Sequence, residues 1–114
     1  MKIKTSLLLT GSLFVAFAGL TPVHAAIDAT AAQALAKKND CTKCHAVDKD
    51  KKATSYKKIA AKYKGKADGE EKVIKNITVA SKVKLTDGTE EEHKVIDTKD
   101  PKALSNLAQW ILAQ

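Results

Sequence analysis

The chain is short and strongly basic: it has 114 residues, 20 lysines, no arginine and a formal net charge of +7. This length predicts a single domain. Aromatic residues make up only 4% of the chain, and no nucleic-acid-binding motif is present. The positive charge therefore does not indicate a protein that binds nucleic acid.

The N-terminal segment has the pattern of an export signal. Two lysines precede an uncharged apolar stretch at residues 7–20, and small residues follow up to Ala25. The apolar stretch is shorter than the about 20 residues that a membrane span needs, although an uncleaved anchor remains the alternative. We predict a signal peptide at residues 1–25, cleavage after Ala25, and a periplasmic domain at residues 26–114 with no stable membrane insertion.

The next residues combine a short helix with a sequence motif. Residues 29–38 are rich in alanine and predict a helix, with Asp28 or Thr30 as the candidate N-cap. The run Cys41-Thr42-Lys43-Cys44-His45 follows, and Cys-x-x-Cys-His is the motif through which haem is attached covalently. Each thiol forms a thioether with one vinyl group, and the imidazole is placed under the iron as its proximal axial ligand. The motif predicts one covalent haem c on Cys41 and Cys44, with His45 as the proximal iron ligand.

Other functions of this motif are less consistent with the sequence. A thioredoxin-like redox pair would be accompanied by a βαβ pattern, which is missing. A structural zinc site usually needs four ligands, so His24 and His93 would have to join the cysteines. A disulfide across two residues would gain little loop-closure entropy.

Three further helices are predicted from caps and apolar spacing. Ser55 can cap a helix that continues to about Lys64 and is stopped by Gly65. Asp68 can cap another that continues to about Asn76. The last helix is expected to begin at Asp100-Pro101 and to run to about residue 112.

The segment between the last two helices is expected to form a two-stranded ribbon. Apolar and polar residues alternate on both sides of the Asp87-Gly88 pair. An Asp-Gly pair between alternating runs is a strong hairpin signal. The pattern predicts a β-hairpin within residues 78–96.

With these motifs in place, the chain resembles a small bacterial class I cytochrome c over nearly all of residues 26–114. Residues 41–48 resemble the haem segment of that family, residues 56–63 resemble the helix that follows it, and residues 108–112 resemble its closing helix. The resemblance implies an all-α fold, here with an inserted hairpin, around one covalent haem. It also implies a single-electron carrier with no enzymatic activity of its own.

The sequence departs from the family at two positions that affect the iron. Ala53-Thr54 replaces the usual Gly-Pro whose carbonyl orients the proximal imidazole, so the acceptor for His45 is unassigned. The family's distal ligand is a methionine before the last helix, but the only methionine here is Met1.

His93 is the predicted distal axial ligand, because it lies near the place of the missing methionine and imidazole is a common haem ligand. Three alternatives remain open. His93 could face solvent beside Glu90, Glu91 and Glu92, a neutral Lys82 or Lys84 could bind the iron, or the iron could be open or bind water.

The predicted function is that of a periplasmic carrier with bis-His iron and a low reduction potential, since a thioether ligand raises the potential and a second imidazole does not. A different class of function is a haem-based gas sensor in which a diatomic ligand displaces His93 from the iron. A permanent subunit of a periplasmic oxidoreductase is a third possibility.

The charge is concentrated around the haem motif, and this bears on the partner. Residues 37–66 contain 11 lysines and three acidic residues, whereas residues 67–114 contain seven lysines and nine acidic residues. We expect a monomer that docks on redox proteins with an acidic patch; a solvated lysine face without a partner is the alternative. The lysines expected to form the basic face are Lys43, Lys49, Lys51, Lys52, Lys57, Lys58 and Lys62.

Overall fold

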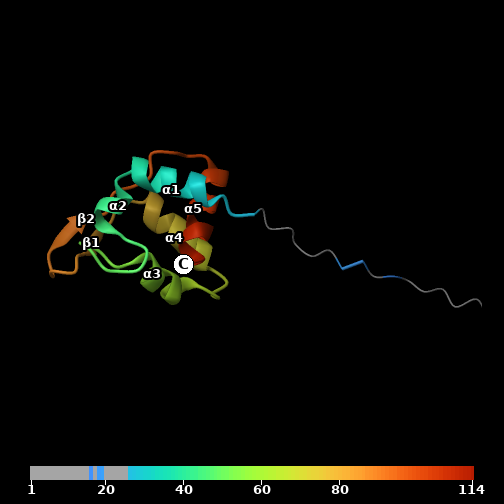
Figure 1. Ribbon diagram of the computed structural model, residues 1–114, viewed down its shortest axis with the longest axis horizontal. Helices are drawn as coiled ribbons and strands as arrows, with labels where there is room; N and C mark the ends of the chain where they lie inside the picture. Colours follow the sequence, from blue (N-terminus) through green and yellow to red (C-terminus); the bar gives the residue numbers. More distant parts are fainter. Residues whose placement is uncertain (1–15, 17, 20–25) are drawn as a thin grey trace, which may run out of the picture.

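The computed structural model describes residues 16, 18–19 and 26–114 (Figure 1). Apart from residues 16, 18 and 19, the predicted signal peptide lies outside the described residues. The rest of the described chain forms helices and one small hairpin. The helices are α1 (Ala29–Lys38), α2 (Cys41–Cys44), α3 (Tyr56–Tyr63), α4 (Gly69–Thr78) and α5 (Pro101–Leu112), and the strands are β1 (Lys82–Lys84) and β2 (Glu90–Glu92).

The helix starts follow from capping residues, with one exception. The side chains of Asp28, Ser55 and Asp100 accept hydrogen bonds from backbone N–H groups of the first turns of α1, α3 and α5, as predicted. Asp68 lies at the N-cap position of α4 but makes no capping bond. Its carboxylate instead pairs with Lys72 at 2.8 Å, so the prediction of a side-chain cap at Asp68 was wrong.

The core lies where α5 packs against α1, α3 and α4. On α5, Leu107 and Ala108 are fully enclosed, and small alanines on α1 allow the two helices to approach closely. Trp110 packs edge-on against Tyr56 of α3, with 5.2 Å between ring centres.

Two hydrogen bonds join the N-terminal helix of the domain to its C-terminal helix. The backbone N–H of Asp28 donates to the Asn106 side-chain oxygen at 2.8 Å, and the Asn106 amide donates to the Asp28 carbonyl at 2.9 Å. This pair of hydrogen bonds ties the start of α1 to the middle of α5. The two helices lie side by side in Figure 1.

The predicted hairpin is present and shorter than the segment predicted for it. The strands are antiparallel, Val83 faces Glu91, and Gly88 in the turn adopts a left-handed φ of 87° that favours glycine. Thr86 anchors the hairpin, because its N–H donates to the Lys52 carbonyl at 2.9 Å and its hydroxyl donates to the Lys51 carbonyl at 2.7 Å. The fold is therefore mostly helical, with a small hairpin before the last helix, as predicted.

Candidate functional site

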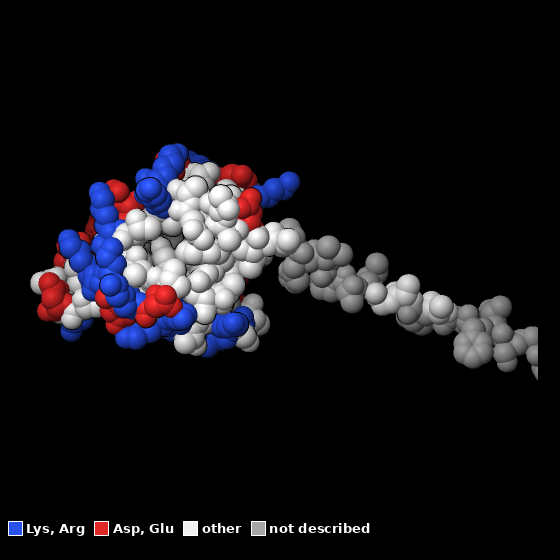
Figure 2. Space-filling view, in the orientation of Figure 1, with Lys and Arg blue, Asp and Glu red and all other residues white. Residues whose placement is uncertain are grey.

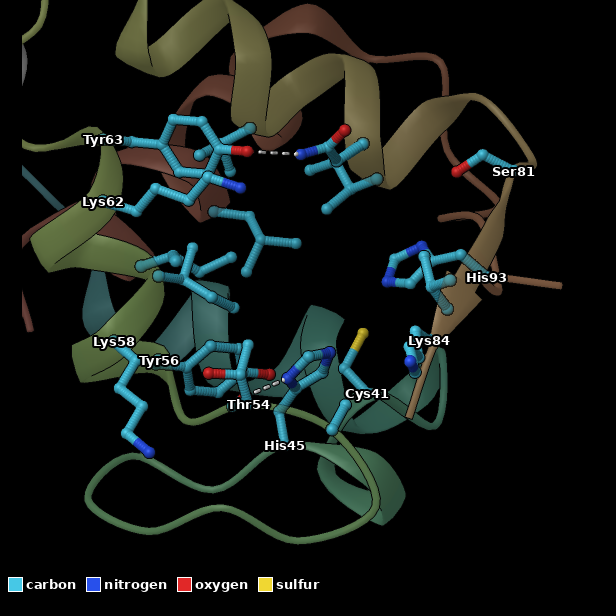
Figure 3. A pocket seen from close by; sticks show the side chains of 18 of the residues that line it. Cys41, His45, Thr54, Tyr56, Lys58, Lys62, Tyr63, Ser81, Lys84 and His93 are labelled. Carbon is cyan, nitrogen blue, oxygen red and sulfur yellow. Dashed lines mark hydrogen bonds between the residues drawn. The ribbon is translucent and has the colours of Figure 1, made fainter. Parts of the chain in front are cut away.

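A cavity of about 640 Å³ lies between the helices and the hairpin (Figure 3). This size is within the range of pockets that hold small molecules and cofactors. Its apolar wall comes from α3, α4 and α5, through Ile59, Val73, Ile77, Leu107 and Ile111. In Figure 2 the face of the molecule in view is hollowed between the hairpin and the helices.

His45 is fixed on one side of this cavity. Its backbone N–H donates to the Cys41 carbonyl at 2.8 Å, at the end of α2. Its ring nitrogen Nδ1 lies 2.6 Å from the Thr54 carbonyl oxygen, and its ring stacks on Tyr56 at 5.4 Å between centres and 21° between planes. Because a carbonyl can only accept, Nδ1 carries the proton and Nε2 is free to bind a metal.

The Thr54 carbonyl supplies the acceptor that sequence reasoning left unassigned. Thr54 occupies the position of the family's proline, and a backbone carbonyl is present whichever side chain the residue carries. The loop is held in place because Asp50 accepts from the Ser55 N–H at 2.8 Å and also pairs with Lys58. The substitution of proline by threonine therefore leaves the orienting hydrogen bond intact.

His93 lies in the opposite wall of the cavity, beside the hairpin (Figure 3). Its backbone N–H donates to the Ser81 carbonyl at 2.8 Å. Burial of the ring, together with the nearby His45, lowers its pKa below 6.5, so the neutral imidazole is favoured at neutral pH. The ring is therefore in the form that can bind a metal.

The separation of the two imidazoles matches that of two ligands on one iron. Their ring centres are 6.2 Å apart and their planes are tilted by 59°. This separation would leave room for one metal ion bonded to a nitrogen of each ring, with bonds of about 2.0 Å. Two imidazoles that bind one metal ion need not be coplanar, so the tilt is compatible with this arrangement.

Two buried polar atoms beside the cavity also fit a bound group. Among the described residues, the Tyr56 hydroxyl and Nδ1 of His93 have no hydrogen-bond partner. Buried polar atoms normally have partners. The cavity, its apolar wall and these two atoms fit a large apolar cofactor with polar or metal contacts.

The two cysteines lie at the edge of the same space. Cys41 lines the main cavity, and Cys44 lines a small adjoining pocket of about 60 Å³ together with Cys41, His45 and His93. Burial raises the pKa of the Cys41 thiol, whereas a redox-active Cys-x-x-Cys pair depends on a lowered one. No cluster of three or more His, Cys, Asp or Glu side chains suited to a metal occurs within the described part of the chain.

The lysine alternatives for the distal position also lie near the cavity. Lys82 and Lys84 are among the residues that line it, but both are exposed on β1. The protonated ammonium of lysine has no lone pair and cannot bind a metal. A lysine ligand would first have to lose its proton.

The predicted basic face is partly neutralised by aspartates. Lys43 pairs with Asp40 at 2.9 Å, Lys57 with Asp48 at 2.5 Å and Lys58 with Asp50 at 2.5 Å. Of the other four lysines of this face, Lys51 donates to the Thr42 carbonyl and Lys62 lies over the Tyr63 ring. No ion pair within the described residues involves Lys49, Lys51, Lys52 or Lys62.

The helical shell, the Cys-x-x-Cys-His run and the cavity between two imidazoles are together the features of a small haem protein of the c type. Residues 29–114 match the family described as cytochrome c, and the chain belongs to that family. Membership, with the cysteine pair at 41 and 44, fits one covalently attached haem c. Family and fold together indicate an electron carrier.

Solved structures of similar sequence have the same fold. The class 1 cytochrome MtoD from Sideroxydans lithotrophicus ES-1 is 54% identical, over 77% of this chain and 97% of that chain, with a TM-score of 0.73. The N64Del mutant of Nitrosomonas europaea cytochrome c552 is 31% identical, over 71% of this chain and 96% of that one, with a TM-score of 0.58. Wild-type cytochrome c552 is 31% identical, over 70% and 95%, with a TM-score of 0.56.

None of the curated proteins compared with the chain matches it. Among the described residues, no helix has both the length and the apolar character needed to cross a membrane.

Proposed function

We propose that this cytochrome is a periplasmic one-electron carrier whose haem is attached to Cys41 and Cys44 and whose iron is bound axially by His45 and His93. The observation that carries the proposal is the 6.2 Å separation of the two imidazole centres across the cavity. When bound, the haem supplies reversible one-electron chemistry at its iron. The chain's own residues hold it, orient its ligands and exclude water.

Each side chain has a defined part in this proposal. The Thr54 carbonyl, 2.6 Å from Nδ1 of His45, fixes the rotation of that ring and increases its basicity. The apolar wall from α3, α4 and α5 keeps water from the site, which stabilises the oxidation state with the lower charge. Two imidazoles without a methionine favour a lower potential than a His/Met pair would give.

The tethers of the hairpin favour a carrier over a gas sensor. A sensor needs a distal ligand that moves away readily, so the segment bearing His93 would have few contacts. Here Thr86 is bonded to the 51–52 backbone, and the Ile96 N–H, beyond His93, donates to the Ile77 carbonyl at 2.8 Å. Anchors on both sides of His93 support a ligand that stays in place during electron transfer.

The absorption spectrum of His93→Ala in both oxidation states tests the ligand assignment. We expect the six-coordinate low-spin spectrum of the wild type to change to a high-spin one, with rapid binding of carbon monoxide to the reduced protein. His93→Met is the matched variant: it should restore six-coordination and raise the potential. An unchanged spectrum in His93→Ala, with a change in Lys82→Ala or Lys84→Ala, would assign the position to lysine.

The same experiment separates the carrier from the sensor. Resistance of the reduced wild-type protein to carbon monoxide supports the carrier. Rapid and complete binding by the wild type would support the sensor instead.

We propose that the partner docks through an acidic patch on the basic face around the haem motif. Lys51 and Lys52 are suitable for a test, because their side chains make no ion pair within the described residues and only their backbone carbonyls hold Thr86. The Lys51 side chain also donates to the Thr42 carbonyl, so the absorption spectrum of the variant should first be shown to match that of the wild type. Reversing both to Glu should slow association with the redox partner and weaken its salt dependence, with little change in potential. Reversal of Lys99 and Lys102, outside this face, is the charge-matched control. Equal slowing by both pairs would leave only a general effect of net charge.

Export and the oligomeric state belong to the same proposal. We expect the periplasmic fraction to contain the protein as a monomer whose N-terminal residue is Ala26. A complex with its partner that persists at high salt would point instead to a permanent subunit of a larger oxidoreductase.

A further inference from the structure

One carboxylate links the haem motif to the segment that bears His93. Asp40 lies between α1 and α2, directly before Cys41. Its Oδ1 accepts from Lys43 at 2.9 Å, and its Oδ2 accepts from Lys94 at 2.8 Å. Lys94 is the residue after His93, so the ion pair joins two segments 54 positions apart in the sequence.

The backbone of Asp40 adopts an unusual conformation that allows this contact. Its φ of 60° places it in the left-handed region, which aspartate and asparagine tolerate better than most residues. It is the only non-glycine residue with a positive φ among those the structure describes. This conformation turns the chain sharply from α1 into α2 and places the carboxylate between Lys43 and Lys94.

The neighbouring residues strengthen the same contact. The side-chain oxygen of Asn39 accepts from the Asp97 N–H at 2.9 Å, and Lys38 pairs with the Asp97 carboxylate at 3.0 Å. Three consecutive residues, Lys38, Asn39 and Asp40, therefore hold the segment at residues 94–97. Of their partners in that segment, the partner of Asp40, Lys94, lies closest to His93 in the sequence.

We propose that Asp40 and Lys94 form a clamp that positions His93 across the cavity from His45. The inference rests on the proposed function, in which His93 binds the iron. His93 needs such help because Nδ1 of its ring has no hydrogen-bond partner among the described residues, unlike Nδ1 of His45 with its carbonyl at 2.6 Å. The position of the distal ring is therefore set by the backbone on either side, and the ion pair holds one of those sides. Asp40 and Lys94 are positioning residues and do not touch the iron.

The clamp can be measured through competition for the iron. In Asp40→Asn and in Lys94→Gln, the affinity of the oxidised protein for added imidazole should rise by about two- to five-fold, the range that an exposed ion pair contributes to an equilibrium. The double variant should match either single variant, because the same contact is lost in each. Lys94→Arg keeps the charge and should restore wild-type affinity.

Reduction potentials distinguish a clamp from a simple effect of charge. If the charges acted only through space, loss of the Asp40 charge would raise the reduction potential and loss of the Lys94 charge would lower it. The two shifts would then have opposite signs, and the double variant would show their sum. A clamp changes imidazole affinity in the same direction in both variants and shows no additivity.

Two controls isolate the contact with Lys94. Lys43→Gln removes the other partner of Asp40. Among the described residues Lys43 forms its ion pair with Asp40 and none with residues 93–97, so imidazole affinity should stay unchanged. Asp68→Asn with Lys72→Gln removes a pair of similar length on α4, 2.8 Å, and should also have no effect.

The outcomes separate this inference from the proposed function. If His93→Ala leaves the spectrum unchanged, the bis-His assignment fails. If His93→Ala opens the iron but Asp40→Asn and Lys94→Gln leave imidazole affinity unchanged, or shift it in opposite directions, the clamp alone is overturned.

Discussion

The two imidazoles that face each other across the cavity are supported in different ways. His45 follows α2, has its Nδ1 bonded to the Thr54 carbonyl, and stacks on the buried ring of Tyr56. His93 follows β2, and its Nδ1 has no such partner among the described residues. One imidazole is held by the core of the domain, and the other by tethers on its surface.

Burial explains this difference. Tyr56 and Ser55, beside His45, are 4% and 2% exposed. All of β2 and both lysines of β1 are exposed, and only Val83 between them is half-buried. The His45 side therefore gains its stability from the hydrophobic effect, while the His93 side depends on individual hydrogen bonds and ion pairs. Loss of one contact should lower global stability on the first side and change mainly ligand access on the second.

The largest effect is expected from Tyr56→Ala. Removing a buried aromatic ring that contacts both His45 and Trp110 should lower the free energy of unfolding by about 3–5 kcal/mol. Denaturant unfolding of the haem-loaded protein, followed by circular dichroism, measures it. Val83→Ala in the hairpin should cost less than half as much, and a larger loss there than at Tyr56 would reverse the comparison.

Tyr56→Phe is the matched control for this prediction. It keeps the ring and its contact with Trp110 and removes a hydroxyl that has no hydrogen-bond partner among the described residues. Stability should stay within about 1 kcal/mol of the wild type.

A smaller loss is expected from Ser55→Ala. The Ser55 hydroxyl caps α3 by accepting from the Lys58 N–H at 3.3 Å, and removal of such a cap costs about 1 kcal/mol. The same unfolding measurement should show this loss. The affinity for added imidazole, measured separately, should change little, because the Thr54 carbonyl still orients the His45 ring. Ser55→Thr, which keeps a hydroxyl that can cap, should recover most of the stability.

Thr86→Ala tests the other side of the comparison. The Thr86 hydroxyl donates to the backbone of residues 51 and 52, so its loss frees the hairpin turn while the N–H bond of the same residue stays. We expect a stability change below about 0.5 kcal/mol, as for most exposed positions, together with faster binding of carbon monoxide. Thr86→Ser keeps the hydroxyl and should behave as the wild type. A large loss of stability with unchanged ligand binding would contradict the distinction between the two sides.

A small effect that disappears in acid is expected from Asp50→Asn. The Lys58 ammonium and the Ser55 N–H hold the pKa of Asp50 below 3.8. A carboxylate with a lowered pKa in the folded state stabilises the fold above its unfolded pKa, and this contribution is lost as the pH falls through the folded pKa. Unfolding measured across the acid range should show a flatter curve for Asp50→Asn, converging with the wild type at the lowest pH. A parallel offset at every pH would mean that ionisation of Asp50 is not responsible.

The sequence predicted the elements whose signals are local. Caps at Asp28, Ser55 and Asp100 marked three helix starts, and Asp87-Gly88 marked the hairpin. The one-turn helix α2 was not predicted, because four residues are too few to show a periodic pattern. Asp68 was predicted to cap α4, but its pairing with Lys72 competes with the cap and is not visible in a propensity.

Contacts distant in the sequence had no such signal. The Thr54 carbonyl is a backbone acceptor that every residue type carries, so the residue type at this position gives no signal of the hydrogen bond. The pairing of Asp40 with Lys94 depends on how the hairpin lies against α1. His93 was singled out because the chain offers few other ligands; the 6.2 Å separation from His45 became measurable only in the folded structure.

The hydrogen bonds between Asp28 and Asn106 affect the order in which the domain can assemble. A chain made from its N-terminus completes the haem motif long before Asn106, and before Leu107 and Ile111, which supply one wall of the cavity. Until the last helix exists, α1 lacks the helix with which it makes most of its contacts. Attachment of the haem can therefore precede closure of the fold, and the final turns of the chain then close the domain around a cofactor already bonded to it.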